Sequence, residues 1–421
     1  MSRKDAKPID EILDIALEAG TIILQNGGET YRTEETMTAI ATSLGAESAS
    51  AFVTPTVVML TCTGHDDHSH TRIQRINERF INLGKIARVN ELSRRLVQKG
   101  RDSNLKQVES VLTRISNSPL HHPVGVVLAT ASASFCFSFL FMGTIRDALI
   151  SFAVGAILRF ILFMVNPLGL SGFMISALGG FIITLLSGLA VACGLAISPG
   201  NISIAVLMSL VPGLAIVNAI RDIIAGDLLA GSARLLEAFV IAAALSLGAA
   251  FGLMLFPTET RYVSALLTLD SPAIAFFLAF FATASFAYFF YINRYDIFWT
   301  SLFGGLGWLV YIMVIKFLAG PAAGYMAGAL CVGLLSEVFA VILKKPATVF
   351  IVPGIIPLVP GGGMYETMLM AMWGKMDAAA VTGFNTITAA AAIAVGIALA
   401  SSLARLASRI ISPSLRGRRR L

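Results

Sequence analysis

The residues with the clearest potential to bind a small polar molecule lie in an apolar stretch, 352–365, which reads VPGIIPLVPGGGMY. Each proline removes a backbone donor and strains the preceding turn, so this stretch cannot form one continuous helix. The freed N–H and C=O groups can bind a carboxylate, an ammonium or an ion where protein or a cavity surrounds them. We therefore predict a substrate pathway; the alternative is a kinked helix with structural glycines. The pathway residues here are Pro353, Gly354, Pro357, Pro360, Gly361, Gly362, Gly363 and Tyr365.

A second stretch, 211–227, begins in a similar way and reads VPGLAIVNAIRDIIAGD. Its Pro-Gly pair predicts a break or kink, and polar residues follow it. Ionisable groups inside a membrane are costly and are therefore candidates for function. The charged residues fit equally well an anchor at the membrane surface, paired with Arg234 and Glu237. The candidate residues are Pro212, Gly213, Asn218, Arg221, Asp222 and Asp227.

Two further carboxylates lie in or beside apolar runs. Glu337 is part of LLSEVFAVI, and Glu366 follows the triple glycine. A carboxylate buried at membrane depth binds a proton more readily than one in water, so either residue can carry a coupling proton. A salt bridge or a hydrogen bond across helices is the alternative for each.

Near the N-terminus, residues 27–32 read GGETYR. By itself this pattern indicates a glycine-terminated turn and a helix start near Thr30 or Thr33, with Glu29 and Arg32 close to that end. Farther on, the loop 64–71 contains His65, Asp66, Asp67, His68 and His70, which are metal-capable residue types. A short His-rich tract is only compositional evidence for metal binding, so we expect a solvated loop and no metal site.

Several reaction types lack the residues they need. All five histidines lie at or before position 122, which disfavours a histidine-dependent protease or metalloprotease within the apolar runs. No GxxxxGK[ST] sequence occurs, and no pair of intramembrane aspartates is visible. The four cysteines share no close spacing, so neither a disulfide framework nor a metal cluster is indicated. We expect no cofactor and no enzyme.

Composition divides the chain into two parts. Of its 421 residues 56% are hydrophobic and only 13% are charged, which is typical of a membrane protein. Residues 1–122 carry 15 Lys/Arg and 15 Asp/Glu, whereas residues 123–421 carry 16 and 10. In the first part we expect helices over 8–26, 33–44, 84–100 and 104–117, and two strands within 48–63 split at Pro55. This predicts a small α+β domain over 1–122, preceded by no signal peptide.

From residue 123 the apolar runs are long enough to span a bilayer, which takes about 20 residues each. We expect ten helices, of which the third and ninth are long and favour a break or a tilt. They cover about 123–142, 147–165, 171–197, 201–220, 234–256, 273–292, 297–318, 322–343, 347–373 and 378–402. Val211-Pro212-Gly213 in the fourth helix is echoed by Val352-Pro353-Gly354 in the ninth, which predicts two inverted five-helix repeats, 123–256 and 273–404.

Charge predicts the orientation of these helices. With both termini in the cytoplasm, twelve Lys/Arg lie at cytoplasmic ends and four at external ends, as the positive-inside rule requires. Six of the twelve belong to a basic tail near 405–421: Arg405, Arg409, Arg416, Arg418, Arg419 and Arg420. We expect this tail to face anionic membrane lipid and not nucleic acid. The sequence leaves a homo-oligomer open.

Four segments together resemble the threonine/serine exporter family: GGETYRTEETM (27–37), AFVTPTVVMLT (51–61), and the two stretches that begin at 211 and 352. Residues of about 10–255 resemble its larger module, and residues of about 273–405 its smaller one, here fused. The resemblance implies export of threonine and serine from the bacterial cytoplasm, driven by the proton motive force. It carries over Glu29, Thr30 and Arg32 as characteristic residues of the soluble domain, and Asn218, Arg221, Asp222 and Asp227 as the polar cluster of the fourth helix.

We therefore expect a secondary transporter of the bacterial cytoplasmic membrane that exports small polar amino acids. A succinate-type dicarboxylate exporter is the nearest alternative, because one pair of separate modules in this family is linked to succinate export. A hydrolase within 1–122 and a gated channel are further alternatives, although no nucleophile–base pair is visible in that part of the chain.

Overall fold

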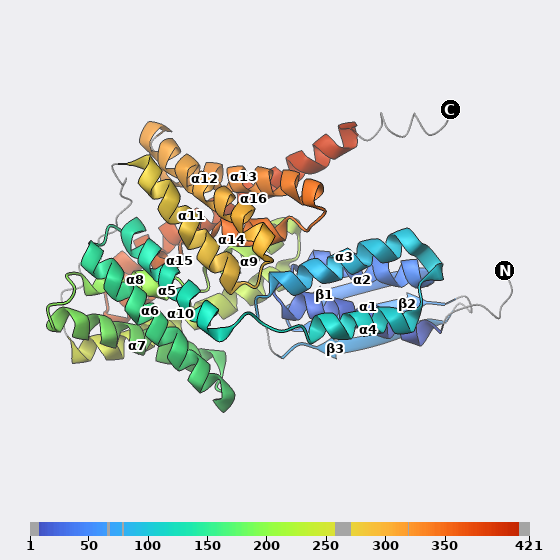
Figure 1. Cartoon of the computed structure of the whole chain (residues 1–421), viewed down its shortest axis with the longest axis horizontal. Helices are drawn as coiled ribbons and strands as arrows, with labels where there is room; N and C mark the ends of the chain where they lie inside the picture. Colours follow the sequence, from blue (N-terminus) through green and yellow to red (C-terminus); the bar gives the residue numbers. More distant parts are fainter. Residues whose placement is uncertain (1–7, 65–67, 78–79, 257–270, 319, 412–421) are drawn as a thin grey trace.

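The structure is a computed structural model, which describes residues 8–64, 68–77, 80–256, 271–318 and 320–411. It is mainly helical. The first four helices and the strands lie together at the right of Figure 1, and the remaining helices form a larger body beside them. The basic segment 412–421 and most of the link 257–272 lie outside the described residues.

The N-terminal part is a three-stranded antiparallel sheet with helices on one face. β2 alternates strictly, and Val58, Leu60 and Cys62 are buried toward α1, as a half-buried strand requires. The elements are α1 (Ile9–Gln25), α2 (Thr30–Leu44), β1 (Ser48–Thr54), β2 (Val57–Thr63), β3 (Ser69–Arg75), α3 (Leu83–Lys99) and α4 (Leu105–Ser116). The helices and the first two strands lie where the sequence predicts them.

β3 was not predicted, because the segment was expected to be a loop. Its composition is polar, and six of its seven residues are exposed, so it carries no hydrophobic alternation. Polar contacts hold it instead: Thr61 and Thr71 share a hydrogen bond of 2.9 Å, and Arg72 lies 3.1 Å from the Asp14 carboxylate of α1. An edge strand held by such pairs is not visible in a hydrophobic pattern.

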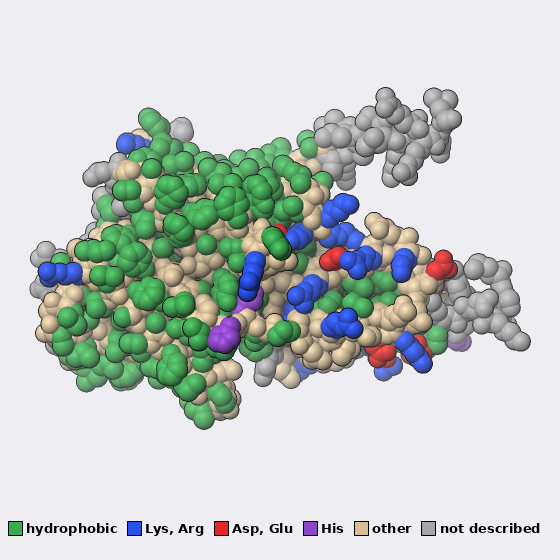
Figure 2. Space-filling view, viewed as in Figure 1, with side chains coloured by type: hydrophobic (Ala, Val, Ile, Leu, Met, Phe, Trp, Pro, Cys, Tyr) green, Lys and Arg blue, Asp and Glu red, His purple; other side chains and the backbone are tan. Residues whose placement is uncertain are grey.

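Eight helices of the helical part are long and apolar enough to cross a membrane, and a ninth candidate is a bent pair, counted over the described residues only. Figure 2 shows hydrophobic side chains covering this part, whereas the charged side chains gather over the N-terminal part. The eight are α5 (Pro123–Leu140), α6 (Ile145–Val165), α7 (Gly172–Ala192), α10 (Leu228–Leu255), α11 (Pro272–Phe289), α12 (Arg294–Leu318), α13 (Pro321–Leu343) and α16 (Met376–Ile411).

The fourth predicted helix, 201–220, is broken at its Pro-Gly pair, as the sequence predicts. That region consists of α8 (Pro199–Leu207) and α9 (Gly213–Ala225), each too short to cross a bilayer. The ninth is broken as predicted, into α14 (Thr348–Gly354), the short 3-10 turn η4 (Ile356–Leu358) and α15 (Gly361–Met372), with a bend of 50°. The third, α7, has no break.

Glycine explains why α7 and α10 pack closely. A Cβ atom on Gly248 of α10 would lie 1.8 Å from the Ala177 carbonyl oxygen of α7, so the two backbones can touch only because Gly248 has no side chain. α13 and α16 meet in the same way, since a Cβ atom on Gly396 would lie 2.5 Å from the Met326 carbonyl oxygen. The two broken helices pack against these two helix pairs.

Candidate functional site

The two broken helices meet at their breaks. α9 begins after Val211-Pro212, and α15 begins after Val359-Pro360. A Cβ atom on Gly213 would lie 2.1 Å from Cγ1 of Val359, and a Cβ atom on Gly361 would lie 3.0 Å from Cγ1 of Val211. The contact is reciprocal, because the first glycine of each half-helix packs against the valine that precedes the other half-helix.

A cavity of about 580 Å3 lies against these breaks. Its wall includes Val211, Pro212 and Gly213 from one break, and Val359 and Gly361 from the other. The first N–H groups of a helix have no partner within the helix, so α9 and α15 both offer backbone donors here. Seven residues with polar side chains also line the cavity: Arg159, Asn166, Ser209, Asn218, Arg234, Glu237 and Tyr291.

The N-terminal part reaches the same cavity through the Gly27-Gly28 turn between α1 and α2. This turn is attached to α10, because Arg234 of α10 donates a hydrogen bond of 3.2 Å to the Gly28 carbonyl. Phe80 and Ile81, just before α3, contribute apolar side chains to the wall. Two stretches of the chain separated by more than 180 residues therefore build one site.

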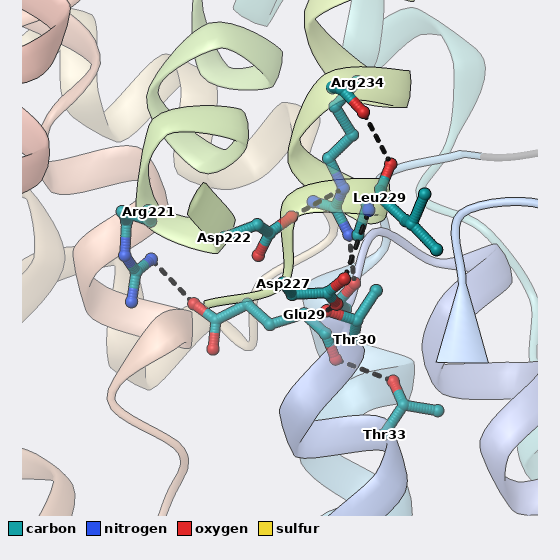
Figure 3. Close-up of polar contacts among 11 residues, drawn as sticks. Glu29, Thr30, Thr33, Arg221, Asp222, Asp227, Leu229 and Arg234 are labelled. Atoms are coloured by element: carbon teal, nitrogen blue, oxygen red, sulfur yellow. Dashed lines mark hydrogen bonds and ion pairs between the residues drawn. The ribbon is translucent and has the colours of Figure 1, made fainter. Parts of the chain in front are cut away.

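Beside this turn lies a buried cluster of charges, drawn in Figure 3. Glu29 forms ion pairs with two arginines: Arg221 Nη1 lies 2.7 Å from Oε1, and Arg32 Nε lies 2.8 Å from Oε2. Asp222 and Arg234 form a second ion pair, with 3.2 Å between Oδ2 and Nε. These contacts tie α2 to α9 and α9 to α10.

Thr30 completes the cluster, because its hydroxyl donates a hydrogen bond of 2.8 Å to Asp227 Oδ2. The other oxygen of Asp227 accepts from the Ala230 amide and caps the start of α10. Glu29 is the N-cap residue of α2, but its side chain makes no capping hydrogen bond. The capping role that the local sequence indicates is therefore not observed. Its side chain instead holds two parts of the chain together.

The charge state of Glu29 is fixed by its neighbours. Burial by itself raises the pKa of this carboxyl, but Arg221 and Arg32 outweigh burial and lower the pKa to about 2. Burial, together with the nearby Glu29 carboxylate, raises the pKa of Tyr31 to about 12. Glu29 therefore keeps its negative charge throughout the physiological pH range.

The predicted site residues divide into three groups: those on the cavity wall, those in the charged cluster, and those in neither. The cavity wall includes Pro212, Gly213, Asn218 and Gly361, and the charged cluster includes Glu29, Thr30, Arg32, Arg221, Asp222 and Asp227. The remaining residues line neither place: Glu337, Pro353, Gly354, Pro357, Pro360, Gly362, Gly363, Tyr365 and Glu366. Pro353 and Gly354 lie within α14, which is buried, and Gly354 packs against Val332.

Glu337 lies away from the cavity, near the end of α13. It accepts a hydrogen bond of 2.7 Å from Ser401 of α16. It also lines a smaller pocket of about 330 Å3 with Arg32, Arg94 and Lys344, where the N-terminal part meets α13. Glu366 lies on α15 and is half-buried.

Sequence reasoning did not select Arg159, Arg234 and Glu237, although all three line the cavity. The available signal was the presence of a charge within or beside an apolar run. Arg234 and Glu237 lie near the start of α10, so their spacing fits a membrane-surface anchor as well as a site. Only the contact of α10 with the N-terminal part shows that this end is covered by protein.

With this geometry in place, the chain was compared with known proteins. Residues 14–256, more than half of the chain, match the threonine/serine exporter family model. The chain belongs to this family. A second exporter model, described as Threonine/Serine exporter, ThrE, matches residues 275–403. The exporter family is therefore represented in both halves of the helical part.

Individual exporters and related proteins agree with this assignment. A protein of Corynebacterium glutamicum named "Threonine/serine exporter" is 25% identical over 415 residues, which is 95% of this chain and 82% of the relative. Proteins of Klebsiella aerogenes and Escherichia coli K12, both named "Probable succinate transporter subunit YjjP", are each 25% identical and cover 58% and 57% of this chain, and 92% and 91% of their own length. No solved structure matches the chain.

Membership places this chain in an exporter family of membrane transport proteins. The apolar helices agree with a place in a membrane. A transporter needs a small-molecule site that helices can open to each side, and the cavity at the two breaks is the natural candidate.

Proposed function

We propose that this exporter carries threonine and serine out of the bacterial cytoplasm, as a secondary transporter driven by the proton motive force. The observation that carries the proposal is the cavity of about 580 Å3 at two helix breaks. Secondary transporters bind their substrates at such discontinuous helices, where half-helix ends present unpaired backbone groups. The name of the Corynebacterium glutamicum relative, which matches 95% of this chain, supports this substrate class.

We infer that the helical part consists of two inverted five-helix repeats, α5–α10 and α11–α16, with α8/α9 and α14/α15 as the broken members. Matched packing supports this: α7 lies on α10 as α13 lies on α16, and α6 lies on α8 as α12 lies on α14. Between the halves, α9 contacts α16 and α10 contacts α15, which is the exchange that a two-fold axis produces. α5 and α11 contact each other, as equivalent helices beside such an axis do.

The repeat aligns differently from the sequence echo. Val211-Pro212-Gly213 corresponds in this arrangement to Val359-Pro360-Gly361, because each tripeptide starts a second half-helix. We propose that the N-terminal part is a cytoplasmic domain that covers the inner mouth of the cavity. The excess of Lys/Arg at the proposed cytoplasmic ends supports that orientation.

Succinate export is the second candidate, because the two YjjP relatives carry that name. A dicarboxylate needs two cationic groups at its site, and two arginines, Arg159 and Arg234, line the cavity. Arg234 is paired with Asp222, however, which leaves less positive charge than a dicarboxylate requires.

The test is efflux of labelled threonine, serine and succinate from proteoliposomes that contain the purified protein, with and without an imposed pH gradient. Gradient-dependent flux of threonine or serine is expected. Flux of succinate alone would transfer the chain to the dicarboxylate class, and flux of none of the three would contradict the transport proposal.

A further inference from the structure

Arg159 is a half-buried positive charge within the apolar helix α6. Its Nε donates a hydrogen bond of 3.2 Å to Thr130 Oγ1, and its guanidinium lies over the Phe289 ring at 4.3 Å. The Nη2 atom is buried and has no hydrogen-bond partner among the described residues, and none of the ion pairs found in that part of the chain includes Arg159. A buried charge without a counter-charge is strongly unfavourable.

The unsatisfied guanidinium belongs to the wall of the cavity at the helix breaks. The planar guanidinium binds a carboxylate with two parallel hydrogen bonds, and its face packs on an aromatic ring, as Phe289 does here. The first-turn N–H groups of α9 and α15 add donors to the same cavity. These groups together suit a carboxylate and leave a neutral ligand no means of neutralising Arg159.

The remaining charges of the wall indicate the class of carboxylate. Arg234 is engaged by Asp222 and by the Gly28 carbonyl, so it offers little to a second carboxylate. Asn218, Ser209 and Tyr291 bring acceptor oxygens to the wall, which suit an ammonium group. One cationic residue open to a ligand, with acceptors in the same cavity, matches a zwitterion better than a dianion.

We propose that Arg159 binds the carboxylate of the transported substrate and that the site takes an α-amino acid zwitterion. This inference rests on the proposed transport function and assigns the residue that recognises the substrate. Phe289 and Thr130 hold the guanidinium in place at the wall of the cavity.

The experiment measures ligand binding by the detergent-purified full chain, using threonine, serine, succinate and threoninol, which lacks the carboxylate. Arg159→Met removes the charge at similar length, and Arg159→Lys keeps the charge without the fork. Arg146→Met is the matched control, because Arg146 is an exposed arginine at the start of the same helix. Flux of threonine in proteoliposomes is measured in parallel, and thermal melting without ligand verifies that each variant folds.

We expect the wild-type protein to bind threonine and serine but not threoninol. Arg159→Met should bind threonine about 10- to 100-fold more weakly, Arg159→Lys should be intermediate, and Arg146→Met should be unchanged. Equal threonine binding and flux in Arg159→Met and wild type would overturn the role of Arg159 while leaving the proposed transport intact.

Two other outcomes separate the inference from the proposed function. Binding of succinate instead of threonine, lost in Arg159→Met, would support the carboxylate role and overturn the zwitterion and the amino acid substrate. Binding of threoninol as tight as that of threonine would overturn the carboxylate role, even if threonine is transported.

Discussion

The two half-helices that follow the breaks, α9 and α15, begin alike and end differently. Each starts with a glycine after a Val-Pro pair, and the sixth residue of each is polar: Asn218 in α9 and Glu366 in α15. The ninth and tenth residues of α9 are Arg221 and Asp222, whereas the ninth and tenth of α15 are Leu369 and Met370. The shared start fits a common role in forming the cavity.

The different ends show which half is connected to the N-terminal part. α9 ends beside Glu29, and the residue after its C-cap glycine is Asp227, which accepts from Thr30. α15 ends at an exposed Trp373, over which the Lys375 ammonium stacks at 5.6 Å. Among the residues that the structure describes, the first break alone is therefore attached to the N-terminal part by buried charges.

The largest expected effect concerns the glycine with which each half-helix begins, Gly213 in α9 and Gly361 in α15. Gly213→Ala places a methyl group 2.1 Å from Val359, so the breaks must separate, and initial threonine flux should fall about 100-fold. Gly361→Ala meets Val211 at 3.0 Å and should lose less. Flux into proteoliposomes, normalised to inserted protein, measures both.

Suppression makes this prediction specific. Val359→Ala removes the methyl group that Gly213→Ala would strike, so the double variant should recover much of the flux. Val211→Ala should act in the same way on Gly361→Ala. Failure of both suppressors would show that the breaks do not meet as described.

The sixth position distinguishes the breaks chemically. Glu366→Gln gives α15 a neutral amide, as α9 already has in Asn218. If Glu366 carries the coupling proton, exchange of labelled for unlabelled threonine should continue while the stimulation by a pH gradient disappears. Asn218→Ala is the control, which should weaken transport without removing the gradient dependence. A gradient response unchanged in Glu366→Gln would assign coupling to another group.

The charged end of α9 should be sensitive to loss of its anion. Glu29→Gln leaves Arg221 and Arg32 without their buried counter-charge, which should destabilise the protein by about 3 kcal/mol in thermal melting. Glu35→Gln, an exposed change on the same helix, should have little effect. Equal melting temperatures for the two variants would mean that the cluster does not hold α2 against α9.

The smallest expected effect is a flat pH dependence. The pKa of Glu29 is lowered from 4.5 to about 2 in the folded protein, so its stabilising contribution is complete above pH 4.5 and is lost as the pH falls toward 2. The difference in melting temperature between wild type and Glu29→Gln should therefore be constant from pH 7 to 8 and shrink below 4.5. A difference that changes between pH 7 and 8 would place another titrating group at the junction.

The sequence predicted the elements with strong hydrophobic patterns. It also predicted both helix breaks, because proline interrupts a helix in any context. It did not predict β3, whose stability comes from side-chain pairs with β2 and α1. In the proposed repeat, Val211-Pro212-Gly213 pairs with Val359-Pro360-Gly361 and not with the tripeptide that begins seven residues earlier, because the folded chain shows that the later tripeptide starts a half-helix.

The candidate site was predictable in its parts and not as a whole. Pro212, Gly213 and Gly361 were identified from backbone chemistry that holds wherever the residues lie. The contact between Thr30 and Asp227 joins residues 197 positions apart, and no local spacing encodes it. Arg159 was visible as a charge in an apolar run, but its unsatisfied Nη2 is a property of the packed structure.

The most direct test of the account asks whether substrate occupies the cavity at the two breaks. Ser209 lines this cavity, so Ser209→Cys in a chain whose native Cys62, Cys136 and Cys331 are replaced reports on it. Exposed Cys193 is kept as an internal control. Threonine should slow maleimide labelling at position 209 about 10-fold and leave Cys193 unaffected. Labelling at 209 that proceeds equally fast in saturating threonine would contradict the placement of the substrate between the breaks.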